Sequence, residues 1–512
     1  MPDVRQIDGK LLARNTGLNL LGQGLPLLVG LATIPYVVHG LGTERFGILS
    51  IAWVLLGYFS LFDLGLGRAT TKFVAECLGE GEMYRLAVLV WTSAGIQMLF
   101  GAAGAVIAAA ATFFLVEKLL KIPVYLIHDA KLTFILLAGS LPVVLLTNCL
   151  RGVLEAAQRF DLVNYLKVPV SVSVFLLPAI AIPFGIGLPG IALLLILARF
   201  GAAVGYLVLC LKVFPVLRRT FSFRYGLLRP LATYGGWVTV SNLVSPLFSY
   251  IDRFFIGALL SMAAVTFFTA PFEAITRAGL VLPLSLVATL FPAFSTLDAS
   301  AARERMEFFF VRSLKLILLV QGPVLLLVVV FAPLILRLWL GADFAANSTL
   351  TLQLLAVGVG INSLAHIPYN LLQGLGRPDV TAKFHLTELP IYTGFLWFLT
   401  GRMGISGAAL AWSLRVGLDA LLLFGACRWL RLVSVRALLD RGLLRSIMVL
   451  GVFALALSLT WLAKMSLVAQ AVLVVSLVSL FSLSTWSFAL DNADRSFLVS
   501  AAGRVIPFGR AK

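Results

Sequence analysis

The sequence predicts an all-α polytopic membrane protein with about fourteen transmembrane helices, and three observations support this fold class. Hydrophobic residues make up 60% of the 512 residues and charged residues only 12%, against roughly 25% charged residues in soluble domains. The mean hydropathy is +1.01, and apolar runs of about 20 residues, the length that crosses a bilayer as a helix, recur along the chain. Basic residues gather in alternate loops between these runs. Such a chain needs lipid around much of its surface.

The apolar runs define the expected spans in order. The N-terminal stretch carries charges of both signs and precedes an apolar run too long for a signal-peptide core, so a retained first span is expected. The segment 254–270 is also apolar and is interpreted as a span end followed by a short turn. The expected spans lie within 16–38, 46–66, 86–115, 132–150, 163–184, 188–211, 231–251, 271–294, 311–336, 350–372, 384–400, 405–426, 443–463 and 467–490.

The distribution of Lys and Arg predicts the orientation in the membrane. With a cytoplasmic N-terminus, the loops after even-numbered spans are also cytoplasmic, and these loops hold most of the basic residues. Cytoplasmic loops carry this excess in membrane proteins generally. We therefore expect a multi-pass membrane protein with both termini in the cytoplasm. The net charge of +17, which in a soluble protein would indicate nucleic-acid binding, is assigned to these loops, and no nucleic-acid partner is expected.

A weak internal repeat is visible. An Arg-x-Asp motif at 159–161, after the fourth span, recurs at 377–379, after the tenth. The turn after the first span, GLGTERFGILS, resembles the turn after the seventh, GALLSMAAVTFFT, and aligns Gly47 with Thr266 at almost the same offset. The shared offset predicts two six-helix halves in the same orientation, an arrangement that places a substrate between them in transporters.

The repeat also predicts the domain organisation. An N-terminal lobe of six spans is expected over 1–211, followed by a basic cytoplasmic linker over 212–230. A C-terminal lobe of six spans is expected over 231–430. Residues 431–512 then supply two additional transmembrane helices and a cytoplasmic tail.

Several classes of chemistry lack their sequence signals. Four cysteines and four histidines are scattered along the chain without a CxxC or a zinc-ligand spacing, so no metal site is expected. Gly65-Leu-Gly67 does not follow a strand, and no Walker A sequence occurs, so direct use of ATP is not expected. No expected outer loop exceeds about 20 residues, which leaves no room for an external catalytic domain. A transporter without a catalytic site fits these absences better than an enzyme does.

Charged residues inside the expected spans are costly to bury and are therefore candidates for function. Arginine suits a diphosphate because its planar guanidinium donates paired hydrogen bonds and stays charged. Buried carboxylates can bind a coupling proton or Na⁺. The substrate-binding candidates are Arg199, Arg277, Arg415 and Arg68, and the ion-coupling candidates are Glu273, Asp419, Glu388 and Asp63.

Several of these residues also have a purely structural interpretation. Glu273 and Arg277, and likewise Arg415 and Asp419, are four residues apart, so each pair shares a helix face and can simply neutralise itself. Arg199 has no acid within one turn, so its partner is expected elsewhere in the lumen or in the substrate. Arg68 and a further arginine, Arg253, lie near span ends, where snorkelling to the lipid headgroups is the alternative.

Three segments carry a family resemblance. The strongest is 34–74, which reads IPYVVHGLGTERFGILSIAWVLLGYFSLFDLGLGRATTKFV; the others are 150–165 and 369–379. These segments resemble bacterial polysaccharide (O-antigen or exopolysaccharide) flippases of the multidrug/oligosaccharidyl-lipid/polysaccharide exporter superfamily. The likeness covers roughly residues 10–430, and the last two spans are an addition seen in some members.

The resemblance implies a two-lobed, V-shaped transporter that works by alternating access. It implies a polyprenyl-diphosphate-linked oligosaccharide as substrate, moved from the inner to the outer leaflet with energy from an ion gradient or the membrane potential. A polysaccharide polymerase and other export components are the expected protein partners. Alternatives are a drug/cation antiporter or a peptidoglycan-precursor flippase of the same superfamily, a membrane polymerase or glycosyltransferase, and a passive scaffold of an export complex.

Overall fold

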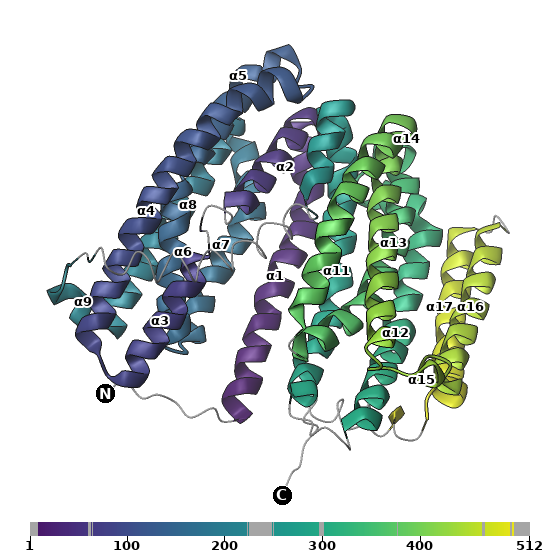
Figure 1. The fold of residues 1–512 in the computed structure, drawn as a ribbon. Helices are drawn as coiled ribbons and strands as arrows, with labels where there is room; N and C mark the ends of the chain where they lie inside the picture. The colour runs from purple at the N-terminus through teal and green to yellow at the C-terminus, as the bar shows by residue number, and fades with distance from the viewer. Residues whose placement is uncertain are drawn as a thin grey trace, which may run out of the picture. The chain divides into compact units, whose positions relative to one another are not determined.

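The computed structural model describes the backbone of residues 9–59, 63, 65–222, 224, 248, 250–295, 302–375, 377–462, 466–491, 494 and 495. Within these ranges the chain is helical and contains no strand, as Figure 1 shows. The first group of helices is α1 (Gly9–Leu41), α2 (Thr43–Tyr58), α3 (Leu66–Glu80), α4 (Met83–Phe114), α5 (Ile127–Gly139), α6 (Leu141–Ala156), α7 (Phe160–Ala181), α8 (Leu188–Val213) and α9 (Val216–Arg219).

Residues 250–259 are also helical. The remaining helices are α11 (Met262–Ser295), α12 (Ala302–Trp339), α13 (Ala342–Gly374), α14 (Pro378–Trp429), α15 (Val435–Leu438), α16 (Arg441–Leu462) and α17 (Leu467–Ser484), the last continued by a π-helical turn, η6 (Thr485–Ala489). The turn expected within 254–270 lies at residues 260 and 261, just before α11.

Ten helical stretches of the described chain are long and apolar enough to cross a membrane. They coincide with the expected spans except the second, seventh and eighth, and one of them, α14, holds both the eleventh and the twelfth. The all-α membrane fold is therefore confirmed. The total of about fourteen spans stays a prediction, because the seventh expected span lies mostly outside the described residues.

Three expected spans have a shape that hydropathy did not indicate. The fourth is divided between α5 and α6, because Pro142 stands in the first turn of α6 and has no N–H to continue the preceding helix. The eleventh and twelfth form the single long helix α14, which is broken at Gly404. There φ is 61° and ψ is −141°, a backbone conformation that is open essentially to glycine alone.

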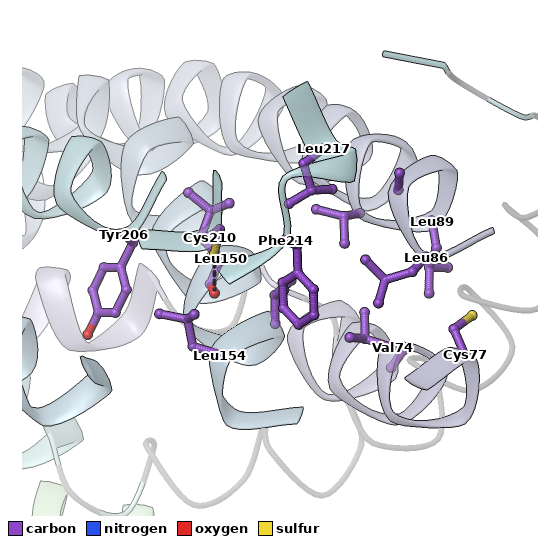
Figure 2. Close-up of a cluster of buried hydrophobic side chains, with 14 of the residues drawn as sticks. Val74, Cys77, Leu86, Leu89, Leu150, Leu154, Tyr206, Cys210, Phe214 and Leu217 are labelled. Atoms are coloured by element: carbon purple, nitrogen blue, oxygen red, sulfur yellow. Dashed lines mark hydrogen bonds between the residues drawn. The ribbon is translucent and has the colours of Figure 1, made fainter. Parts of the chain in front are cut away.

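The chain divides into two compact units. One consists of residues 1–274 together with 395–408, and the other of residues 275–394 together with 409–512. The core of the first unit joins α3, α4, α6, α8 and α9, and Figure 2 shows Leu86, Leu150 and Phe214 meeting there. The second unit has one core around Phe310 and Leu371 and another that packs α16 and α17 against α12. The expected linker at 212–230 runs into residues outside the described part, so the lobe boundary stays a prediction.

The structure repeats local arrangements at the offset seen in the sequence. Three pairs of helices begin at almost the same separation along the chain: α2 and α11, α4 and α12, and α7 and α14. The Arg159–Asp161 pair precedes α7 with an Nη2–Oδ2 distance of 3.0 Å. The Arg377–Asp379 pair stands at the start of α14 with an Nε–Oδ1 distance of 3.0 Å. Each motif therefore forms the same helix-start ion pair within its own unit.

The cysteines follow the same repeat. The Cys210 thiol donates to the Leu150 carbonyl at 3.3 Å in the first unit, and the Cys427 thiol lies 4.0 Å from the Pro368 carbonyl in the second. The two thiols, and likewise their two acceptors, are separated in sequence by almost the same offset as the Arg-x-Asp motifs. Both thiols are buried.

Candidate functional site

The second unit buries a cluster of charged side chains around the two arms of α14. Arg415 Nη1 lies 3.8 Å from Glu388 Oε2, and the Glu388 side chain is fully buried. In a straight helix these residues would lie about 40 Å apart along the axis, at 1.5 Å per residue. The break at Gly404 therefore brings them together. Sequence spacing had related Arg415 to Asp419 alone; the structure also brings Glu388, from the other arm of α14, to Arg415.

The second carboxyl group of this cluster belongs to Asp419, which faces Glu388 and is 8% exposed. His366 of α13 and His385 of α14 also lie close enough to Asp419 to interact with its charge. Within the described part of the chain, neither oxygen of Glu388, nor Oδ1 of Asp419, nor Nε2 of His366 has a hydrogen-bond partner. Buried polar atoms normally have partners, so this cluster has unused capacity for a small ligand.

The charge balance of the cluster favours a cation as that ligand. With both carboxyl groups ionised, Glu388 and Asp419 carry two negative charges against the one positive charge of Arg415. One bound cation would make the cluster neutral, and a neutral cluster is favoured in a buried, weakly polar environment. Arg415 also lies 5.8 Å from the ring centroid of the fully buried Tyr392, which holds the guanidinium in place. The arrangement brings two buried acids and one guanidinium together, and the ion-coupling role of Glu388 and Asp419 stays a prediction.

Arg199 lies apart from this cluster, in the middle of α8 in the first unit. Its side chain is partly buried. Among the residues that the structure describes, Arg199 has no acid and no hydrogen-bond acceptor as partner. An unneutralised guanidinium inside a membrane span is costly, and such groups mark sites for anionic ligands. The expected partner of Arg199, in the lumen or in the substrate, stays a prediction.

Glu273 has a partner that the sequence did not indicate. Its Oε1 accepts a hydrogen bond from Arg253 Nη2 at 2.6 Å, and Arg253 Nη1 lies 3.4 Å from Asp252 Oδ1. The Arg253 side chain is 1% exposed and packs 4.8 Å from the ring centroid of Phe272. Snorkelling to the headgroups is therefore wrong for Arg253, because its guanidinium is buried among aromatic rings and carboxylates. The side chain of Arg277 is exposed.

Asp63 has a structural task at the start of α3. Both of its carboxylate oxygens lie 3.1 Å from the backbone N–H of Gly67, which the first turn of the helix leaves without an intrahelical acceptor. Gly65 precedes the helix with φ of 71°, a left-handed conformation that favours glycine. This explains the Asp-Leu-Gly-Leu-Gly-Arg spacing as a helix cap. Arg68 is exposed one residue later, and its role in substrate binding stays a prediction.

Of the eight predicted site residues, the structure therefore brings together Glu388, Arg415 and Asp419. It keeps Arg199 in the middle of α8 and places Asp63 and Arg68 together at the start of α3, all in the first unit. It pairs Glu273 with Arg253 and leaves the side chain of Arg277 exposed. Sequence reasoning missed His366 and His385 as neighbours of the cluster. Both are on the expected spans ten and eleven, but no sequence spacing relates them to Asp419, because the fold of α14 and the packing of α13 bring them near it.

The helical fold and the charged groups buried within its apolar spans define a polytopic helical membrane protein. A family profile described as "Polysaccharide biosynthesis protein" matches residues 12–298. The chain is 32% identical over 428 residues to a Shigella flexneri protein named "Putative O-antigen transporter", in a match that covers 83% of this chain and 99% of that protein. The chain belongs to the polysaccharide biosynthesis protein family, as the three sequence segments predicted.

Solved structures show the same fold. An inward-facing multidrug-resistance MATE transporter of the MOP superfamily aligns with a TM-score of 0.68 at 17% identity, over 81% of this chain and 95% of that one. The lipid II flippase MurJ, in an inward closed conformation, aligns with a TM-score of 0.70 at 12% identity, over 92% of this chain and 98% of that one. At these identities the likeness concerns the fold, and it confirms the predicted MATE-like architecture.

Proposed function

We propose that this protein is a flippase that moves a polyprenyl-diphosphate-linked oligosaccharide from the inner to the outer leaflet of a bacterial cytoplasmic membrane. Membership of the polysaccharide biosynthesis family supports this proposal, as does the likeness over most of the chain to a protein named as an O-antigen transporter. We propose alternating access as the mechanism, with both termini in the cytoplasm. A polysaccharide polymerase and other export components are the proposed protein partners, and the protein itself has no enzymatic role.

The observation that carries the substrate class is Arg199. Its guanidinium is held in the middle of an apolar helix, and the described residues supply no acid to neutralise it. The diphosphate of a lipid-linked sugar supplies two negative charges and several acceptor oxygens, which a guanidinium binds with paired hydrogen bonds. A cationic drug would be repelled at this position, so the site favours the flippase over a drug/cation antiporter.

The cluster of Glu388, Asp419 and Arg415 is the proposed coupling site. A proton is the better fit, because no three His, Cys, Asp or Glu side chains within the described residues converge as they would around a metal ion. Na⁺ prefers several oxygen ligands, as hard cations do. One elementary charge moved across 100 mV is worth about 2.3 kcal/mol, so each bound proton could contribute useful energy to one transport cycle.

Purified protein in proteoliposomes would test this proposal. A fluorescent polyprenyl-diphosphate oligosaccharide would be offered on one side, under an imposed pH, Na⁺ or voltage gradient, and its movement would be followed by quenching from the other side. Wild type would be compared with Arg199→Gln and with a matched control, Arg402→Gln, which changes an exposed arginine of α14.

The proposal requires protein-dependent flipping that Arg199→Gln abolishes and Arg402→Gln leaves intact. Unchanged flipping in both variants would support the flippase function but would exclude Arg199 from the substrate-binding site. Movement of lipid II in place of the oligosaccharide lipid would identify a peptidoglycan-precursor flippase instead. Absence of flipping of either lipid under every gradient would overturn the proposal in favour of a scaffold or of a membrane polymerase or glycosyltransferase.

A further inference from the structure

The two C-terminal helices, α16 and α17, form an apolar groove of about 300 Å³ with the π-helical turn η6. Most of the surface of α17 is uncovered by protein: only 6% of its spanning segment is buried, compared with 50% for α13. The groove therefore opens to the membrane and not to the inside of the helix bundle. Its apolar lining includes Val452, Phe453, Ala456, Leu477, Leu480 and Phe481.

One end of this groove carries two arginines. Phe488, which lines the groove, has the guanidinium of Arg445 5.1 Å from its ring centroid. Ser487, also in the lining, accepts a hydrogen bond through its carbonyl from Arg495 Nη2 at 3.1 Å. The positive-inside distribution assigns this end to the cytoplasmic surface. The groove thus joins an apolar trough to a cationic rim.

The acids near this rim are already engaged elsewhere. Asp494 lies 2.7 Å from Lys315 Nζ and 3.1 Å from Arg312 Nε, and Asp491 lies 3.3 Å from the same Lys315. Partial burial acts to raise the pKa of the Asp491 carboxyl, but the backbone N–H of Asp494 and the Lys315 ammonium outweigh it and hold that pKa below its ordinary value. Both acids are therefore occupied by the cations of α12.

Arg445 and Arg495 remain without an acidic partner among the residues that the structure describes. Arg445 is exposed and Arg495 is partly buried, with its Nε making no hydrogen bond to the described residues. Two unneutralised guanidinium groups at the end of a membrane-facing groove need an anion that comes from outside the chain. The bilayer supplies anionic headgroups at this depth, each attached to acyl chains that suit the groove.

We propose that the groove between α16 and α17 binds one anionic phospholipid of the bilayer, with an acyl chain along the groove and its phosphate paired with Arg445 and Arg495. Charge complementarity selects this occupant over a neutral lipid. A hydrophobic helix of another protein would fill the trough but would leave both guanidinium groups unpaired. The proposal does not depend on the transport function, because lipid binding is measured without any transport.

Native mass spectrometry and thermal unfolding of the full chain in detergent would test it, with phosphatidylglycerol, phosphatidylcholine and undecaprenyl phosphate as probes. Phosphatidylglycerol is expected to bind and to raise the unfolding temperature, and phosphatidylcholine is expected to do neither. Arg445→Gln and Arg495→Gln should each weaken phosphatidylglycerol binding about fivefold, the share of one arginine near an anionic surface.

Two further variants separate the groove from general surface charge. Ala456→Phe keeps both arginines but fills the trough, and it should abolish phosphatidylglycerol binding. Arg402→Gln removes an exposed arginine far along the sequence from the groove and should leave binding unchanged. Equal binding of phosphatidylcholine and phosphatidylglycerol, or unchanged binding in Ala456→Phe, would overturn the proposal. Undecaprenyl phosphate binding with no phosphatidylglycerol binding would overturn it too, and would assign the groove to a substrate tail.

Discussion

Arg415 Nη1 and Glu388 Oε2 lie 3.8 Å apart although a long stretch of α14 separates the two residues in sequence. The helix reverses at Gly404, so its two arms carry the acid and the arginine to the same place. Asp419 joins them from one turn beyond Arg415. Two buried carboxyl groups beside one guanidinium can hold one more positive charge, and this property leads to the first prediction.

Glu388→Gln and Asp419→Asn should each abolish the stimulation of transport by an imposed gradient, because each removes one of the two negative charges that a coupling cation would balance. Movement of substrate down its own gradient should persist. The measurement is the initial rate of flipping in proteoliposomes with and without a pH or Na⁺ gradient.

Glu76→Gln is the matched control, because Glu76 is an exposed acid of α3 whose partner, Lys72, is equally exposed. Gradient stimulation that survives in both cluster variants would exclude Glu388 and Asp419 from coupling. A loss shared by Glu76→Gln would point to a general effect of charge.

Arg253→Met should lower the free energy of unfolding by about 3–5 kcal/mol, because it removes the buried guanidinium that pairs with Glu273 and Asp252. Arg253→Lys should cost less, since it keeps the charge and loses only the planar contact with Phe272. Thermal unfolding followed by size-exclusion chromatography in detergent measures both. If Arg253→Met were as stable as wild type, the buried ion pairs would have no part in holding α11.

Gln353→Leu should destabilise the second unit, because Gln353 donates a hydrogen bond to a backbone carbonyl that has lost its helical donor to a proline. Pro333 has no N–H, so the Val329 carbonyl, four residues earlier in α12, lacks its helical donor. Gln353 Nε2 of α13 donates to that carbonyl at 2.9 Å. Removing the amide leaves a partly buried acceptor unsatisfied, at a cost of about 1 kcal/mol.

The double variant Gln353→Leu/Pro333→Ala makes this test specific. Alanine restores the N–H that the Val329 carbonyl needs, so the loss due to Gln353→Leu should shrink in the Pro333→Ala background. Unfolding temperatures of the four proteins in the cycle give the interaction energy. Strict additivity would show that Gln353 does not satisfy the carbonyl left open by Pro333.

A second glutamine has the same relation to a proline. Gln321 of α12 donates to the Gly279 carbonyl at 3.0 Å, four residues before Pro283.

Gly47→Ala should destabilise the first unit by about 1–3 kcal/mol, as overpacking does in tight cores. A Cβ at Gly47 would overlap the backbone carbonyl of Met262, where the first turn of α11 packs against α2. Gly79→Ala in α3 is the matched control, because a Cβ there meets nothing within 4 Å. It should raise stability by up to about 1 kcal/mol through helix propensity.

The two glycine variants are compared by unfolding temperature at equal expression. A loss of stability in both would mean that the helices tolerate no change at glycine, whatever the space available. No loss in Gly47→Ala would mean that α2 and α11 can separate without cost, which would contradict the close approach of their first turns.

Much of the fold followed from local properties of the sequence. Apolar length alone located most spans, because a helix needs about 20 apolar residues to cross a bilayer wherever it lies in the chain. The repeat followed from the Arg-x-Asp motifs, because an arginine and an aspartate two residues apart pair locally at a helix start. The glycines and the aspartate of Asp63-Leu-Gly-Leu-Gly likewise act within one turn, as a cap.

The candidate site was only partly within reach of the sequence. The positions of Glu388, Arg415 and Asp419 inside apolar runs correctly marked them as buried charges, because a charge within a membrane span is costly and therefore a candidate for function. Spacing related Arg415 to Asp419 and gave Glu388 no partner, because Glu388 reaches Arg415 only through the break in α14. The reversal at Gly404 and the burial of Arg253 among Phe272 and Glu273 depend on which helices meet, and contacts between residues distant in the chain leave no periodic signal.

Composition and hydropathy were therefore enough to predict a polytopic helical membrane protein, and short motifs were enough to indicate its internal repeat, because bilayer thickness and local helix chemistry act on consecutive residues. The ion pairs of Arg415 and Arg253, the donors that reach proline-freed carbonyls, and the groove with its arginine rim arose from packing. In each of these the stabilising partner comes from another helix, or from the other arm of a broken one, at a position set by three-dimensional geometry.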